Sequence, residues 1–201
     1  MEILMKIERK ILILITIGIM MITSNVFAAN GRSASIKENI TKLHAEVFEV
    51  LKKLGKNGEG SMKIHLGGGL HTSLGGRERF IYEERVDIDI SSSGITKILF
   101  YYTQTNEKNM EDTVSVIFLN ENPSDEEFSG LTLKYEATLE KDAEFKYSEV
   151  EEKFQYKILV GYRDKLENLI RALGVLYETS VAREKAGLGK VLQIGKEQED
   201  N

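Results

Sequence analysis

A glycine-rich segment at residues 67–77 holds polar side chains of the kinds that bind or transform a ligand. His71, Ser73 and Arg77 lie among its five glycines. A phosphate-binding loop would require Lys followed by Ser or Thr after the last glycine, and the serine elbow of a hydrolase would require glycine at position 71. Neither pattern is present, so we interpret the segment as a hairpin or a pair of strand ends with glycine bends. Such a loop can present His71, Ser73 and Arg77 to a ligand.

The histidines are a second group of candidate catalytic or metal-binding residues. His65 and His71 could meet Asp87 or Asp89 across neighbouring strands and form a metal site or an acid–base pair. The spacing is not diagnostic of a metal motif, and His65 alternates with apolar neighbours, which predicts a solvated side chain. We therefore assign no catalytic residue, metal or cofactor. A hydrolase or metal-dependent enzyme built on His65, His71 and Ser73 stays as an alternative.

Aromatic residues gather on one face of the predicted strands. The tyrosines among them are Tyr82, Tyr102, Tyr135, Tyr147 and Tyr156. A ring with a polar tip can pack in a core or line a binding site, so these residues are either core or a cradle for an apolar or amphipathic ligand between sheet and helix. Glu84 has the same parity as Tyr82. We interpret it as displaced by a β-bulge, with a polar group inside the cradle as the alternative.

Two amphipathic helices are predicted, one on each side of the strands. The first begins at Ser35, which forms a capping box with Glu38, and it ends near Gly55. Its apolar stripe recurs at steps of three and four: Ile36, Ile40, Leu43, Val47, Leu51 and Leu54. The second helix runs from about Asp164 to Ala186 and has the apolar face Leu166, Leu169, Ile170, Leu173, Leu176 and Tyr177.

Between the helices the apolar period changes to two, which is typical of strands with one buried face. Six strands are predicted, at residues 61–66, 80–90, 98–102, 114–118, 131–139 and 145–160, the last one interrupted at 149–153. The segments 106–112 and 120–129 lack periodicity and are predicted to be surface loops. The acidic residues Asp125, Glu126 and Glu127 in the second loop are interpreted as solvated surface.

The order of these elements predicts the fold class. Short connections between strands favour antiparallel neighbours, and strict alternation leaves one face of the sheet in need of cover. The expected fold is α+β with two layers: an N-terminal helix, a meander of about six strands and a long C-terminal helix. A half-barrel that grips the C-terminal helix is the alternative. A single domain at residues 29–190 and a polar tail at 191–201 complete the mature chain.

The face opposite the predicted core also carries apolar residues. These residues are Leu99, Ile117, Leu119 and Leu159. A second apolar patch on a sheet is typical of an interaction surface, so we interpret this face as a second covered patch, and the sequence leaves open whether a homodimer forms through it.

The first 28 residues have the order of a secretory signal peptide. A basic start precedes an apolar run of 12 residues from Ile11 to Ile22, and small residues stand before a cut after Ala28. A membrane-spanning helix needs roughly 20 apolar residues, so we expect cleavage and no membrane span afterwards. Translation from Met1 or from Met5 gives the same mature chain.

Composition excludes several classes of function. The chain of 201 residues has a net charge of −5 and contains no cysteine. The signal segment carries three basic and two acidic side chains, so the mature chain is still more negative, which disfavours binding to nucleic acid. Without cysteine there is no thiol nucleophile, thiolate metal site, disulfide or lipid-modified cysteine.

These observations predict an exported protein of a bacterial cell envelope, either periplasmic or secreted. The expected role is that of a non-enzymatic binding or interaction module. Its partner would be another envelope protein or a small apolar ligand, and a carrier with a cavity between sheet and helix is an alternative form of the same role.

Export is tested by the N-terminus of the protein isolated from its own cells. We expect the intact mass to correspond to a chain that begins at Ala29, because the signal peptidase cuts after small residues. A chain that retains Met1 or Met5 would contradict export.

Overall fold

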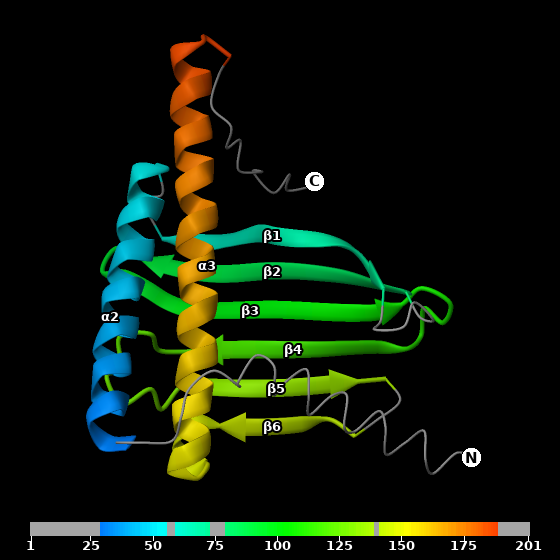
Figure 1. Ribbon diagram of the computed structural model, residues 1–201. Helices are drawn as coiled ribbons and strands as arrows, with labels where there is room; N and C mark the ends of the chain where they lie inside the picture. Colours follow the sequence, from blue (N-terminus) through cyan, green and yellow to red (C-terminus); the bar gives the residue numbers. More distant parts are fainter. Residues whose placement is uncertain (1–28, 56–58, 73–78, 139–140, 189–201) are drawn as a thin grey trace, which may run out of the picture.

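The computed structural model describes residues 29–55, 59–72, 79–138 and 141–188. Within them the order of elements is helix, six strands, helix (Figure 1). The elements are α2 (Ala29–Lys53), β1 (Gly60–Thr72), β2 (Arg79–Ser91), β3 (Gly94–Asn106), β4 (Thr113–Asn120), β5 (Leu131–Ala137), β6 (Ala143–Lys146), the 3-10 helix η1 (Tyr147–Glu149) and α3 (Glu152–Lys185). The predicted α+β arrangement is confirmed.

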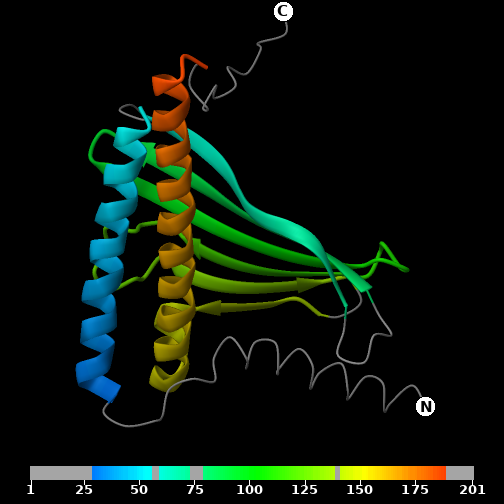
Figure 2. The same cartoon turned by 45° about the horizontal axis from the view of Figure 1, so that its top comes forward.

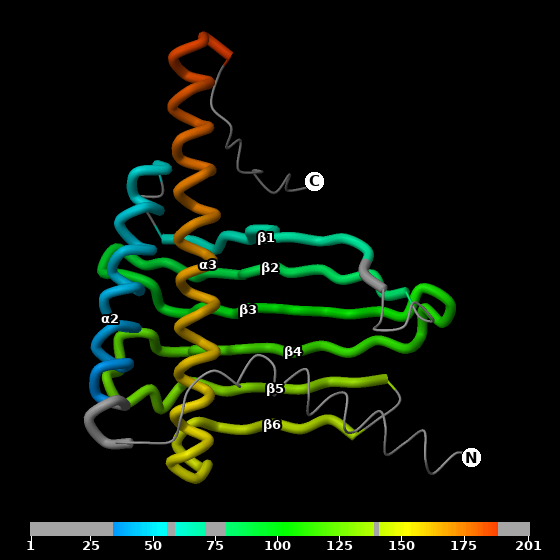
Figure 3. The backbone as a smooth tube through the Cα atoms, viewed as in Figure 1, coloured from blue at the N-terminus to red at the C-terminus, as the bar shows by residue number. Residues whose placement is uncertain are grey.

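The strands form one open antiparallel sheet in the order β1-β2-β3-β4-β5-β6. Figure 3 shows the backbone reversing between successive strands. Apolar residues lie opposite one another in the register, since Val86 pairs with Phe100, Phe100 with Phe118, and Phe118 with Leu133. We call the face that carries this row the inner face. Both helices lie on it, α3 across the strands and α2 beside α3 (Figures 1 and 2), so the sheet is covered as a layer and is not closed into a half-barrel.

The apolar stripe of α2 enters the core as predicted. Its buried members are Ile36, Ile40, Val47 and Leu51, with Leu43 and Leu54 partly buried against them. The predicted end is confirmed, because Gly55 has φ of 88° and its N–H donates to the carbonyl of Lys52 at 2.9 Å. The predicted start at Ser35 is wrong, since the helix begins at Ala29. Glu38 pairs with Lys42 along the helix at 2.6 Å and forms no cap.

The prediction for α3 was also wrong at its start. Residues 154–160, expected to continue the sixth strand, form the first turns of a helix of 34 residues. Ile158, Leu159 and Tyr162 are buried at helical spacing, whereas Phe154, which set the apparent alternation, is 46% exposed. Packing against the sheet therefore decides the conformation. No helix of the described residues is long and apolar enough to cross a membrane.

The glycine-rich segment is partly a strand. β1 continues through Gly67, Gly68 and Gly69, and a register shift between His65 and Gly67 marks a bulge. The bulge predicted at Glu84 is therefore wrong, because the irregularity lies in the strand opposite it. Glu84 stays on the inner face, paired with Gly67.

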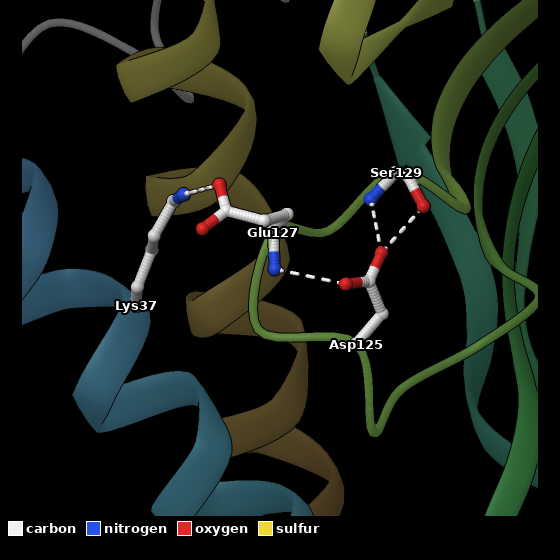
Figure 4. Close-up of polar contacts among 4 residues, drawn as sticks. All are labelled: Lys37, Asp125, Glu127 and Ser129. Carbon is white, nitrogen blue, oxygen red and sulfur yellow. Dashed lines mark hydrogen bonds and ion pairs between the residues drawn. The ribbon is translucent and has the colours of Figure 1, made fainter.

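The loop between β4 and β5 was predicted to lie on the surface, but one of its residues, Phe128, belongs to the core. Phe128 is fully buried with φ of 57°. Asp125 orders this loop by accepting hydrogen bonds from the N–H groups of Glu127 at 3.0 Å and Ser129 at 2.8 Å (Figure 4). The Ser129 hydroxyl also donates to it, and these bonds lower the pKa of the Asp125 carboxyl group. Lys37 on α2 pairs with Glu127 at 3.2 Å, so the acidic loop is joined to the helix layer.

α3 approaches the sheet closely at Gly161. A Cβ atom at this position would lie 3.0 Å from Cζ of Phe118, which is too close for ordinary packing. The next residue, Tyr162, is fully buried, and its ring centroid lies 5.9 Å from that of Phe100 and 6.3 Å from that of Phe118. The missing side chain thus lets the helix lie against the aromatic row of the sheet.

Two glycines of α3 provide a matched test of this contact. Gly→Ala within a helix normally gains about 1 kcal/mol, and at Gly174 a Cβ would have nothing within 4 Å. At Gly161 the same methyl group meets Phe118, and overpacking costs about 1–3 kcal/mol. We expect Gly161→Ala to be less stable than Gly174→Ala by about 2 kcal/mol in urea denaturation. Equal stability of the two variants would contradict the close approach.

Candidate functional site

The long strands extend beyond α3 on the side away from α2 (Figures 1 and 2). On this part of the inner face no other helix of the described residues covers them. The side chains there form two rows across the sheet. One row pairs Tyr82 with Gln104 and Gln104 with Val114, and the other pairs Tyr102 with Val116 and Val116 with Tyr135. We call these six residues the aromatic shelf. Most of them are half-buried, and Tyr135 is 9% exposed.

Two tyrosine rings dominate the shelf. The rings of Tyr82 and Tyr102 stack with centroids 6.3 Å apart and planes inclined by 23°. A Cβ at Gly69 would lie 3.3 Å from Cε1 of Tyr82, so the ring of Tyr82 lies over the backbone of β1 where a side chain is missing. The Tyr102 hydroxyl donates to Oε1 of Gln104 at 3.4 Å. The absence of a side chain at Gly69 therefore makes room for the ring of Tyr82.

A partly buried ion pair borders the shelf on the side of α3. Lys165 donates to Oε1 of Glu84, and the two side chains are 13% and 23% exposed. Nζ of Lys165 also lies 5.8 Å from the ring centroid of Tyr102. Burial, followed by the nearby Glu84 and Tyr82, raises the pKa of the Tyr102 hydroxyl above its ordinary value. Tyr102 is therefore a neutral hydrogen-bonding group at neutral pH.

Of the five predicted ligand-binding tyrosines, the structure brings three together. Tyr82, Tyr102 and Tyr135 lie on the shelf. Tyr147 instead lies in η1, 5% exposed, with its ring 6.3 Å from that of Phe128, and Tyr156 lies on α3. Their assignment to strands was wrong because the sheet ends at β6 and the chain turns into α3.

The proposed catalytic alternative is not assembled in one place. His65 is exposed on the outer face, where its Nδ1 lies 3.3 Å from Glu83. Asp87 and Asp89 share that outer face, and Asp89 accepts a hydrogen bond from Ser61 at 2.5 Å. Because of the bulge after His65, the backbone position of His71, paired with Phe80, belongs to the other face.

Two further candidates, Ser73 and Arg77, lie outside the described residues, so they stay predictions. Among the residues that are described, no group of three or more His, Asp or Glu side chains could hold a metal ion.

The predicted dimer surface on the outer face is smaller than expected. Leu99 and Leu119 lie opposite each other and are half-buried. Ile117 is only 5% exposed, and Leu159 lies on α3 with no exposure at all, so its assignment to a strand was wrong. Next to this patch the guanidinium of Arg85 lies 4.3 Å from the ring centroid of Tyr101. Dimerisation through this face stays a prediction.

Sequence reasoning missed a polar cluster inside the core. His44, on the apolar stripe of α2, is 7% exposed, and its Nε2 lies 2.8 Å from the hydroxyl of the fully buried Tyr162 on α3. Asn120 at the end of β4 is also fully buried and adjoins the same hydroxyl. Burial lowers the pKa of His44 to about 4, opposed in part by the backbone of Pro123, and raises the pKa of Tyr162. The cluster joins both helices to the sheet and is closed to ligands.

The buried His44 predicts a pH dependence of stability. Its folded pKa of about 4 lies below the ordinary 6.5, so as pH falls below 6.5 the unfolded chain takes up a proton that the folded chain refuses. The free energy of unfolding is therefore highest above pH 6.5, and it falls by about 3 kcal/mol in total as the pH is lowered from 6.5 to about 4.

The control is His44→Gln, which keeps a donor near Tyr162 and does not titrate. Urea denaturation at several pH values should show a smaller loss of stability in this variant than in the parent chain. The same loss in both proteins would show that His44 is not the group responsible.

In comparisons with known proteins, the chain matches no family model, no curated protein and no solved structure. The case for a function therefore depends on the geometry of the shelf itself.

Proposed function

We propose that this chain is an exported, non-enzymatic binding module of a bacterial cell envelope that holds a protein partner on the aromatic shelf. The observation that carries the proposal is the uneven cover of the inner face. The helices cover one half of each long strand, and the other half presents Tyr82 and Tyr102 as a stacked pair. Tyrosine is enriched at protein interfaces because it has a large apolar ring and a polar tip.

The composition of the shelf supports a protein partner. Val114 and Val116 give it an apolar floor, while Gln104 and the Tyr102 hydroxyl offer hydrogen bonds at fixed positions. An apolar centre with a polar border is the usual anatomy of a protein interface. The ion pair of Lys165 with Glu84 balances charge at the border, so the shelf does not select a strongly charged ligand.

The packing beneath α3 favours surface binding over a carrier with an enclosed cavity. Tyr162 fills the space between α3 and the aromatic row, and the backbone of Gly161 approaches Phe118 without room for a methyl group. A small apolar ligand between sheet and helix would have to displace this core. The order of the first 28 residues, which is that expected of a secretory signal peptide, supports the envelope as the place of action.

Adjacent tyrosines on opposite faces of β3 allow a sharp test. Three proteins would be compared: the parent chain, the shelf variant Tyr82→Ser/Tyr102→Ser, and the control Tyr101→Ser. Each mature chain would be purified from its own envelope without denaturant, and native mass spectrometry would measure the bound partners. Loss of a central aromatic anchor typically costs at least 2 kcal/mol, or about 30-fold in affinity. We expect the shelf variant to lose its partner and Tyr101→Ser to keep it.

If Tyr101→Ser lost the partner and the shelf variant kept it, the binding site would lie on the outer face instead. Circular dichroism of each variant would establish that the fold is retained before the bound masses are compared.

A further inference from the structure

The strands leave a strip of sheet beside α3, on the side away from α2 (Figures 1 and 2). α3 crosses the sheet near the level of Phe100, because the ring of its Tyr162 lies 5.9 Å from that of Phe100. From this level β3 continues to Asn106, and β2 continues from the paired Val86 to Arg79. At about 3.3 Å per residue, roughly 20 Å of these two strands extends beyond α3.

The strip is wide enough for one more helix beside α3. The axes of packed helices lie about 8–10 Å apart, which corresponds to about three residues along a strand. A helix packed against α3 would therefore lie over the stretch of β3 from Tyr102 to Gln104. Both residues belong to the aromatic shelf, so the shelf lies where a neighbour of α3 would rest.

Backbone chemistry favours a helix over an extended segment as the occupant. The shelf consists of side chains, and the backbone groups of β2, β3 and β4 pair within the sheet. A segment that lies on the shelf must therefore satisfy its own N–H and C=O groups, which are costly to bury unpaired. An α-helix does so internally. An extended segment could pair with the sheet only at its edges, outside the shelf.

Helical spacing shows which side of α3 faces the strip. Successive residues advance by about 100° around an α-helix. Lys165 marks the border of the shelf through its contact with Glu84. The buried Tyr162 and Leu166 lie about 60–100° from Lys165 on the side of α2, where Tyr162 meets His44. Residues about 40–120° away in the opposite direction face the strip. We call those over the sheet the α3 wall: Lys153, Lys157, Gly161, Asp164, Asn168 and Arg171.

The α3 wall has a surplus of positive charge. Lys153 and Asp164 each pair with an oppositely charged neighbour in the sequence, at 2.7 and 2.6 Å. Lys157 and Arg171 are exposed. Lys157 lies 5.7 Å from the ring centroid of Phe154, and Arg171 donates to Asn168 at 2.6 Å. In the part of the chain that the structure describes, neither of them pairs with a carboxylate, so the wall is suited to an acidic neighbour.

The two cations lie near opposite ends of the strip. One helical turn rises about 5.4 Å and the strand spacing is about 4.8 Å, so each turn of α3 advances by about one strand. Tyr162 lies over β3 and β4, which places Lys157 near β5 and Arg171 near the edge formed by β1. The helix between them is about 21 Å long. A partner helix of about four turns would span the same distance and cross the whole shelf.

We propose that the shelf holds one amphipathic helix of another envelope protein, about four turns long, with an apolar stripe on the shelf and acidic side chains toward Lys157 and Arg171. The inference rests on the proposed function, since it names the kind of partner that the shelf binds. Glu84 and Lys165 compensate each other at the border of the shelf, so the acidic side chains belong to the flank that faces the α3 wall. Docking of an amphipathic helix in an apolar groove is a recurring mode of recognition.

Photo-cross-linking in the intact envelope tests the helix. Tyr82, Gln104 and Val114 form a line across three strands, about 4.8 Å apart. Each would be replaced in turn by p-benzoylphenylalanine in the full chain, and mass spectrometry would locate the attachment site on the partner. A helix rises about 1.5 Å per residue, so we expect the sites to lie in one segment and to advance by about three or four residues per strand. Tyr101, on the outer face, is the matched control position and should not attach to that segment.

A reversal of charge tests the acidic flank. Lys157→Glu/Arg171→Glu should lower the yield of the cross-link from position 104 at least tenfold, because like charges would then face each other. Arg183→Glu/Lys185→Glu, in the last turn of α3, changes the net charge by the same amount and should leave the yield unchanged. All four side chains are exposed, so both variants should fold. Equal yields from the two variants would overturn the acidic helix.

The cross-links separate this inference from the proposed function. Sites that advance by one or two residues per strand, that scatter over several segments or that lie in a second copy of this chain would overturn the inference. The proposed function would then stand, because a protein would still occupy the shelf. If no protein attached from any of the three shelf positions, both would be rejected. Helical spacing, together with loss of the cross-link in Lys157→Glu/Arg171→Glu, supports both.

Discussion

The structure depends on one contact, the seating of α3 on the aromatic row of the sheet. Tyr162 is fully buried between Phe100 and Phe118, and Gly161 lets the helix backbone come close enough to hold it there. The hydroxyl group of Tyr162 also forms a hydrogen bond with His44 of α2. The position of α2 therefore follows from that of α3. Because this seat lies toward one end of the strands, the two helices cover only part of the inner face. The uncovered part is the aromatic shelf.

The local pattern of apolar residues was enough to predict a helix layer and a sheet layer, but not the point where the sheet ends and α3 begins. The stripe of Ile40, Val47 and Leu51 could be read from spacing alone, because burial of a helix face leaves a period that no other element shares. The start of α3 could not, since Phe154 and Tyr156 alternate as in a strand, and only the sheet beneath Leu159 and Tyr162 makes a helix the better solution. Contacts between residues distant in sequence outweigh local preference there.

The candidate site shows the same division between local and long-range information. Tyr82, Tyr102 and Tyr135 could be placed on one face from parity, but their separation from Tyr147 and Tyr156 depends on where the sheet ends. His65 and His71 have the same parity in the sequence, and a single bulge assigns their backbone positions to opposite faces. The buried His44 could not be recognised from its sequence context, because its partner Tyr162 is 118 residues away.

The central claim is that the shelf, and not the opposite face of the sheet, is covered in the cell. Tyrosine-directed chemical labelling of the protein in the intact envelope, compared with the purified chain at high dilution, tests this directly because Tyr101 and Tyr102 are neighbours on opposite faces of β3. The account predicts that Tyr82 and Tyr102 are less reactive in the envelope while Tyr101 is unchanged. Protection of Tyr101 with unchanged labelling of Tyr82 and Tyr102 would contradict it.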